Sequence, residues 1–144
     1  MTETSKPSVE VALEEMKTRE LGSIKVFLVE DDQMISDLVM TKLTLSGCIP
    51  YTTANGAEAI EMAQLYTPDV IILDLMLPGL TGEEILTILK SMEDLKNIPV
   101  VIFSNKSEES IKEKVMKLGA ARYYVKAATD LNLFIAELKL LVNK

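Results

Sequence analysis

The chain has 144 residues and a net charge of −7, with 48% hydrophobic and 26% charged residues. This length predicts one domain with a proper core, and the composition excludes a disordered, collagen-like or disulfide-stapled chain. The sequence has no histidine, which excludes histidine metal ligands, histidine general bases and a phosphohistidine carried by this chain. Cys48 is the single cysteine, so we expect a small buried apolar residue and no disulfide.

The acidic balance also limits the kinds of partner. Binding to a nucleic-acid backbone needs clustered lysine and arginine, so we expect no direct contact with nucleic acid. An acidic domain suits a cation or a basic protein surface instead. The first residues lack a secretory apolar region, and Asp74 interrupts the longest apolar run. The sequence therefore predicts a soluble, cytoplasmic protein without a membrane contact.

Residues 1–22 differ from the rest of the chain because they are polar and charged. Their apolar positions include four at the spacing of one helix face: Val9, Ala12, Leu13 and Met16. An isolated helix this short is marginal in water. We predict a frayed or loosely docked extension, with a partner-binding helix as the alternative, and we place the domain itself at residues 23–144.

Strand and helix patterns alternate from residue 24 onward. Residues 24–29 form a β-branched run that predicts a strand, and apolar residues at helical spacing predict a helix over about residues 33–47. Residues 49–53 are a weaker strand candidate. Asn55-Gly56 predicts a turn, after which residues 57–66 have the pattern of a helix.

The second half of the chain continues this alternation. It contains two unbroken apolar runs of the kind that is buried on both faces of a sheet. The expected strands are residues 70–73, 100–103 and 123–125, and the expected helices are residues 81–91, 107–118 and a last one from Thr129 or Asp130 to about 143. Thr81 and Glu84 have the spacing of a capping box at the start of their helix.

Five strands alternating with five helices predict a parallel sheet with helices on both faces and right-handed crossovers. Ligands of such sheets bind outside the carboxyl ends of the strands. Reactive side chains follow four of the five expected strands: Glu30, Asp31 and Asp32 after the first, Asp74 after the third, Ser104 after the fourth and Lys126 after the fifth. We expect these groups to converge on one edge of the sheet.

This set of residue types suits phosphoryl chemistry. Close carboxylates repel one another and need a cation, and oxygen-only ligands favour Mg²⁺. A carboxylate such as Asp74 beside that ion can attack a phosphoryl group, with Lys126 adding positive charge and Ser104 a hydrogen bond. The plainer interpretation is that Asp31 or Asp32 caps the next helix and that Ser104 and Lys126 are ordinary surface residues. Asp74 lies between apolar runs, where a charge is costly unless it is paired or bound.

The motifs resemble the receiver domain of two-component response regulators over roughly residues 24–142. The matching segments are Val29-Glu30-Asp31-Asp32, residues 55–59, residues 69–82 (DVIILDLMLPGLTG), Ser104, and Gly119-Ala120 followed by Tyr123 and Lys126. The resemblance implies an α/β fold with a doubly wound, flavodoxin-like parallel sheet of five strands in the order 2-1-3-4-5 and five helices.

The resemblance also implies roles for the matching site residues. Asp74 would accept a phosphoryl group from a histidine kinase or a phosphotransfer protein, and Lys126 would pair with it. Mg²⁺ would be held by the carboxylates of Asp31 and Asp74. Glu30 would assist through water, and Met76 would offer its backbone carbonyl.

The signal would pass from Ser104 to Tyr123. Ser104 would turn toward the phosphoryl group, and Tyr123 would move inward into the space that Ser104 leaves. The expected result is a changed protein-binding surface for a downstream partner. The first candidate for that surface is the outward face near Ile111, Val115, Tyr123 and Leu131.

One departure from the family pattern concerns Lys126. Ala127 follows it where the family has a cis proline, which predicts a trans peptide and a different aim of the Lys126 side chain. This departure favours the alternative of an interaction module that works without phosphorylation.

No output domain follows residue 144, so we expect a stand-alone regulator that is not a turnover enzyme beyond its own phosphorylation and dephosphorylation. A phosphorelay intermediate stays open as an alternative. An aspartate-based phosphatase of the haloacid dehalogenase type is disfavoured, because Met76 stands where that family has a second aspartate.

Overall fold

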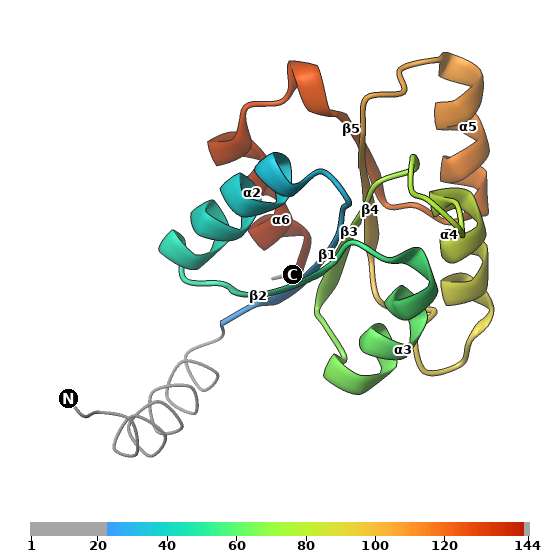
Figure 1. The fold of residues 1–144 in the computed structure, drawn as a ribbon, viewed down its shortest axis with the longest axis horizontal. Coiled ribbons are helices and arrows are strands. Elements are labelled where there is room, and N and C mark those ends of the chain that lie inside the picture. Colours follow the sequence, from blue (N-terminus) through green and yellow to red (C-terminus); the bar gives the residue numbers. More distant parts are fainter. Residues whose placement is uncertain (1–22, 143–144) are drawn as a thin grey trace.

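The computed structural model describes residues 23–142, in which strands and helices alternate along the chain (Figure 1). The predicted extension of residues 1–22, and the end of the last helix at Asn143, lie outside the described residues. The strands are β1 (Lys25–Val29), β2 (Ile49–Thr53), β3 (Val70–Leu73), β4 (Val100–Ser104) and β5 (Arg122–Val125). The helices are α2 (Gln33–Leu45), α3 (Gly56–Tyr66), α4 (Gly82–Ser91), α5 (Glu109–Leu118), the short 3₁₀ helix η1 (Lys126–Ala128) and α6 (Leu131–Val142).

The five strands form one parallel sheet in the order β2-β1-β3-β4-β5, which confirms the predicted fold class. Val29 at the end of β1 is in register with Leu73 at the end of β3. Leu73 is in turn in register with Ile102 near the end of β4. The residues that follow these strands therefore meet at one edge of the sheet.

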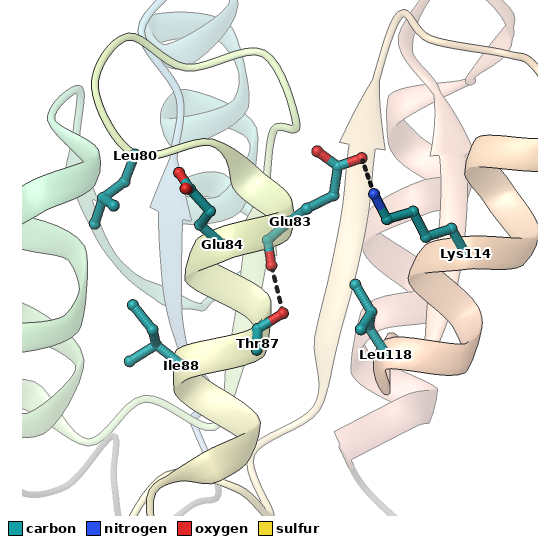
Figure 2. Close-up of a pocket in the computed structure, with 7 residues that line it drawn as sticks. All are labelled: Leu80, Glu83, Glu84, Thr87, Ile88, Lys114 and Leu118. Carbon is teal, nitrogen blue, oxygen red and sulfur yellow. Dashed lines mark hydrogen bonds and ion pairs between the residues drawn. The ribbon is translucent and has the colours of Figure 1, made fainter.

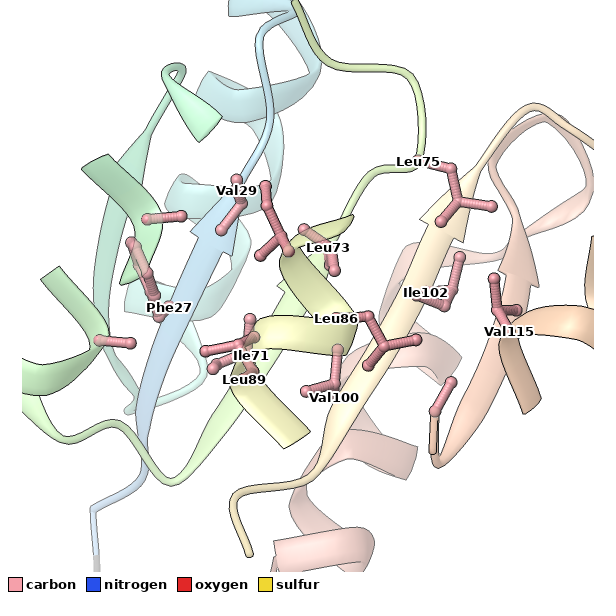
Figure 3. Close-up of a cluster of buried hydrophobic side chains, with 14 of the residues drawn as sticks. Phe27, Val29, Ile71, Leu73, Leu75, Leu86, Leu89, Val100, Ile102 and Val115 are labelled. Carbon is pink, nitrogen blue, oxygen red and sulfur yellow. The ribbon is translucent and has the colours of Figure 1, made fainter. Parts of the chain in front are cut away.

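Side chains of the strands alternate between two hydrophobic layers, as the pleat requires. One layer packs Phe27, Val29 and their neighbours against α3, α4 and α5 (Figure 3). The other packs Val26 and Leu28 against α2 and α6, and it also holds the buried Cys48, as predicted. Both faces of the sheet are thus covered, and the central strand β3 consists entirely of buried apolar residues.

The helix starts follow the capping residues in the sequence. Asp32 caps α2 by accepting hydrogen bonds from the backbone N–H groups of Met34 and Ile35. Thr81 and Glu84 form the predicted capping box at the start of α4. These caps set the directions in which the helices leave the site edge of the sheet.

Several predicted boundaries differ from the observed ones by one or two residues. Gly56 is the first residue of α3, because the Asn55 side chain accepts a hydrogen bond from Ala57 N–H and acts as the helix cap and not as part of a free turn. The helix expected from residue 107 begins at Glu109, where Glu108 supplies no side-chain cap. Within residues 23–142, no helix has the length and apolar character needed to cross a membrane.

Candidate functional site

Three carboxylates meet at the carboxyl edge of the sheet. Glu30 and Asp31 follow β1 and Asp74 follows β3, and one oxygen from each lies within 4.8 Å of the others. Glu30 and Asp74 are 2% and 4% exposed, whereas Asp31 is exposed to solvent. The predicted convergence of these residues is therefore present in the structure, with two buried acids and one at the rim.

The ammonium of Lys126 lies between the two buried acids. Its Nζ is 2.8 Å from Glu30 Oε1 and 3.0 Å from Asp74 Oδ2, and all three side chains are at most 9% exposed. Burial alone would lower the pKa of Lys126, but its hydrogen bonds to the two carboxylates raise that pKa above its usual value.

The predicted change of aim of Lys126 is wrong. The described peptide bonds are all trans, including the one to Ala127, and the Lys126 ammonium still reaches Asp74. The contact of Lys126 with Glu30 was not predicted, because the sequence does not show that one ammonium lies between the carboxylates that follow β1 and β3.

The oxygens of Glu30 are unequally satisfied. Oε2 accepts hydrogen bonds from Lys126 Nζ at 3.0 Å and from Asp32 N–H at 3.1 Å. Oε1 is buried and has no hydrogen-bond partner, since its close approach to Nζ lacks hydrogen-bond geometry. Burial is also the main reason that the pKa of Glu30 is raised, outweighing the opposing effect of Lys126.

This donor set fits Mg²⁺. It consists of carboxylate oxygens, which are the ligands that Mg²⁺ prefers in proteins. Two buried acids and one exposed acid carry three formal negative charges against the one positive charge of Lys126. The exposed position of Asp31 leaves one side of the cluster open to water, which Mg²⁺ retains in its coordination shell.

The backbone around Asp74 is fixed by close packing. Asp74 N–H donates to Val29 O at 3.1 Å, and Asp74 Oδ1 accepts from Met76 N–H at 3.1 Å. A Cβ on Gly82 would lie 2.4 Å from Asp74 O and 2.6 Å from Leu75 Cα. Sequence reasoning missed this role of Gly82; a glycine at the first position of a capped helix, where its helix propensity is poor, was the available signal.

Ser104 and Tyr123 hold the same residue of the loop after β4. The buried Ser104 Oγ accepts a hydrogen bond from Lys106 N–H at 3.3 Å. The Tyr123 hydroxyl donates to Lys106 O at 2.6 Å. Burial, and then the negative charges of nearby acids, raise the pKa of Tyr123, so the phenol is a donor at neutral pH. Ser104 and Tyr123, which were predicted to be coupled, thus both bond to the backbone of Lys106.

The predicted outward face does not exist as one surface. Val115 is fully buried in the layer beneath α3, α4 and α5. Leu131 packs against the other layer, beneath α2 and α6. Helix periodicity predicts the apolar positions but not the side of the sheet on which each helix lies. Of the four residues, Ile111 and Tyr123 are partly exposed and pack against the same layer.

A groove of about 430 Å³ runs between α4 and α5, away from the carboxylates (Figure 2). Leu80, Ile88 and Leu118 give it apolar walls. Glu83 and Lys114 face each other across it at 4.0 Å, with Lys114 63% exposed. A partly exposed pair at this distance contributes little to stability. The groove contains none of the side chains of the carboxylate cluster.

Comparison with known proteins gives a consistent result. The family model described as the response regulator receiver domain matches residues 26–137. The polar-differentiation response regulator DivK of Brucella anthropi is 31% identical over 101 residues, covering 70% of this chain and 82% of DivK. The hybrid signal transduction histidine kinase D of Dictyostelium discoideum is 29% identical over 119 residues, covering 83% of this chain but only 8% of the kinase.

Two solved structures of response regulators share this fold. The phosphorylated cyanobacterial phytochrome response regulator RcpA has a TM-score of 0.71 and 31% identity, covering 83% of this chain and 91% of RcpA. The Mn²⁺-bound form of the response regulator Rcp1 has a TM-score of 0.73 and 28% identity, covering 84% of this chain and 96% of Rcp1.

Proposed function

Because this chain belongs to the response regulator receiver family, we propose that it accepts a phosphoryl group on Asp74 from a phosphohistidine of a partner protein and signals through changed protein–protein binding. The observation that carries the proposal is the state of the Asp74 carboxylate. It is 4% exposed, lies beside Glu30 and Asp31, and is paired with an ammonium at 3.0 Å. A buried nucleophile with positive charge beside it is the arrangement that phosphoryl transfer requires.

The transfer exchanges one bond for another. An Asp74 carboxylate oxygen forms a P–O bond while the P–N bond of the donor phosphohistidine breaks, and the bonding electron pair stays on the imidazole nitrogen. Met76 N–H holds Asp74 Oδ1, so the carboxylate has a fixed orientation. Lys126 remains within reach of the new phosphoryl oxygens and offsets their charge. Hydrolysis by water restores the carboxylate and releases phosphate.

We propose Mg²⁺ as the metal of this site. Asp31 and Asp74 would bind it through carboxylate oxygens, Glu30 through water and Met76 through its backbone carbonyl. When bound, the ion neutralises charge on the phosphoryl oxygens. The oxygen-only cluster supports this assignment, and the relative Rcp1 has been solved in a form with bound Mn²⁺.

The signal would begin at Ser104. Its hydroxyl accepts a hydrogen bond from Lys106 N–H, and a rotation of this side chain toward a phosphoryl oxygen would break that bond. The carbonyl of the same Lys106 is the acceptor of the Tyr123 hydroxyl, so a shift of this residue also changes the position of Tyr123. We propose that this coupled movement alters the partly exposed region around Tyr123 and Ile111. The protein would act by binding and not by turning over a substrate.

Intact-mass measurement after incubation with acetyl phosphate and Mg²⁺ tests the proposal. We expect one added phosphoryl group on the wild-type chain and none on Asp74→Asn or without the metal. Asp94→Asn is the matched control, since it changes an exposed carboxylate elsewhere and should leave labelling unchanged. Labelling of Asp74→Asn to the wild-type extent would reject Asp74 as the acceptor. Binding of Mg²⁺ without labelling, from acetyl phosphate or from a histidine-phosphorylated donor, would favour an interaction module that works without phosphorylation.

A further inference from the structure

The outer face of α2 and α6 is unusually apolar. Of the nine large hydrophobic side chains that are exposed within residues 23–142, five belong to these two helices. They are Met34 (82%), Leu38 (49%) and Leu45 (81%) on α2, and Leu133 (58%) and Leu140 (71%) on α6. The three residues of α2 follow one another at helical spacing, as do the two of α6, so each helix presents a stripe. These five residues are called the α2/α6 face below.

Each of the four charged side chains of α2 and α6 has a hydrogen-bond partner within the domain. Lys42 donates to Asn132 at 3.3 Å, and Lys139 donates to Ser46 O at 2.5 Å. Glu137 accepts a hydrogen bond from the Tyr124 hydroxyl, and Asp37 accepts one from Gln33 within its own helix.

The two lysine contacts also hold α2 beside α6 (Figure 1). The two helices together carry no net charge in a protein whose net charge is −7. The face is therefore built for apolar contact.

The described part of the chain begins beside the C-terminal end of α2. Ser23 Oγ donates to Gly47 O at 3.3 Å, just beyond the last turn of α2. Ile24 is buried in the layer that also contains Leu141 and Val142 of α6. Ser23, the first described residue, thus contacts Gly47, which follows Leu45 by two residues.

We propose that the segment of residues 8–20 packs on the α2/α6 face as an amphipathic helix. Val9, Leu13 and Met16 fall on one side of such a helix, and the other side carries acidic and basic residues. Thirteen residues span about 20 Å as a helix, which equals the length of the 13-residue α2. Because a helix this short is marginal alone, its apolar side needs a surface to stabilise it. The α2/α6 face has the matching apolar character, and α2 ends beside Ser23, where the described part of the chain begins.

Hydrogen exchange of the full chain, followed by mass spectrometry of its peptides, tests this proposal. We expect amides of residues 8–20 to exchange at least roughly tenfold slower than those of an unstructured peptide, independently of protein concentration. Leu13→Glu should abolish this protection. Val11→Glu is the matched control, since Val11 lies on the opposite side of the helix and its change should leave protection intact.

A second pair of variants tests the surface itself. Leu45→Glu on α2 should abolish the protection of residues 8–20, whereas Leu65→Glu on α3, also strongly exposed, should not. Both positions are exposed enough for the domain to fold in either variant. Three results would overturn the proposal: unprotected residues 8–20 in the wild-type chain, protection that survives Leu45→Glu, or protection that rises with concentration. The last result would mean that a second copy covers the face.

Discussion

Replacement of Lys126 by methionine removes the positive charge from the centre of the site while keeping much of the side-chain bulk. Two carboxylates that are at most 4% exposed, those of Glu30 and Asp74, then lose their common partner. Leaving a charge buried without its partner costs about 3–5 kcal/mol. Since a domain of this kind is stable by about 5–15 kcal/mol, we expect Lys126→Met to lose a large part of its unfolding free energy in the absence of Mg²⁺.

Mg²⁺ should restore much of this loss. The ion supplies the missing positive charge, and it no longer competes with an ammonium for the same oxygens. At a concentration one hundred times its Kd, a ligand of the folded state stabilises it by about 2.7 kcal/mol. Because the variant should bind the ion more tightly than the wild type, a given Mg²⁺ concentration should raise its unfolding free energy more.

Urea unfolding followed by circular dichroism, with and without Mg²⁺, measures both effects. Lys42→Met is the matched control: its ammonium donates to the neutral amide of Asn132 at 3.3 Å, so we expect a change within about 0.5 kcal/mol. A loss below about 1 kcal/mol for Lys126→Met without the metal would refute the reasoning. So would a Mg²⁺ response no larger than that of the wild type.

Three further changes test other parts of the account. Asp31→Asn should weaken Mg²⁺ binding by about tenfold or more in a calorimetric titration, because it removes a carboxylate ligand, whereas Asp32→Asn keeps a helix cap and should not. Gly82→Ala forces a Cβ into the backbone after β3, so we expect a loss of about 1–3 kcal/mol in urea unfolding together with loss of phosphoryl labelling. Burial, and then a hydrogen bond to Glu137, raise the pKa of Tyr124 to about 12, so its phenolate should form last in an ultraviolet pH titration and earlier in Glu137→Gln.

The sign of the Tyr124 effect follows from its raised pKa. The stability that it contributes is fully present below pH 10, its unfolded value, and is lost as the pH rises through about 12. Ionisation of Tyr124 near pH 10 would contradict the assigned hydrogen bond. Equal Mg²⁺ affinities of the Asp31 and Asp32 variants would contradict the ligand assignment, and normal labelling of Gly82→Ala would show that the loop tolerates displacement.

The fold could be predicted from the sequence because its central strands are buried on both faces of the sheet. Residues 70–73 and 100–103 are unbroken apolar runs, and they became β3 and the start of β4. The capping residues Thr81, Glu84 and Asp32 likewise predicted where two helices begin. The alternation of strands and helices then gave a parallel sheet, so the convergence of the acids, Ser104 and Lys126 at one edge followed from topology.

What could not be predicted depends on contacts between distant segments. The position of Lys126 between Glu30 and Asp74, and the shared contact of Ser104 and Tyr123 with the Lys106 backbone, arise from loop conformations that no periodic pattern encodes. Leu131 was grouped with Ile111 and Tyr123 although it packs in the other layer, because helical spacing does not say which layer a helix joins. The sequence shows which residue types follow each strand, whereas the structure shows which of these side chains contact one another.

Identification of the modified residue tests the central claim most directly. After incubation with acetyl phosphate and Mg²⁺, borohydride converts an aspartyl-phosphate to homoserine, which peptide mass spectrometry locates. The account predicts homoserine at position 74, in a protein that retains its fold. Homoserine at another acid, such as Asp31 or Asp69, would contradict the assignment of Asp74 as the phosphoacceptor.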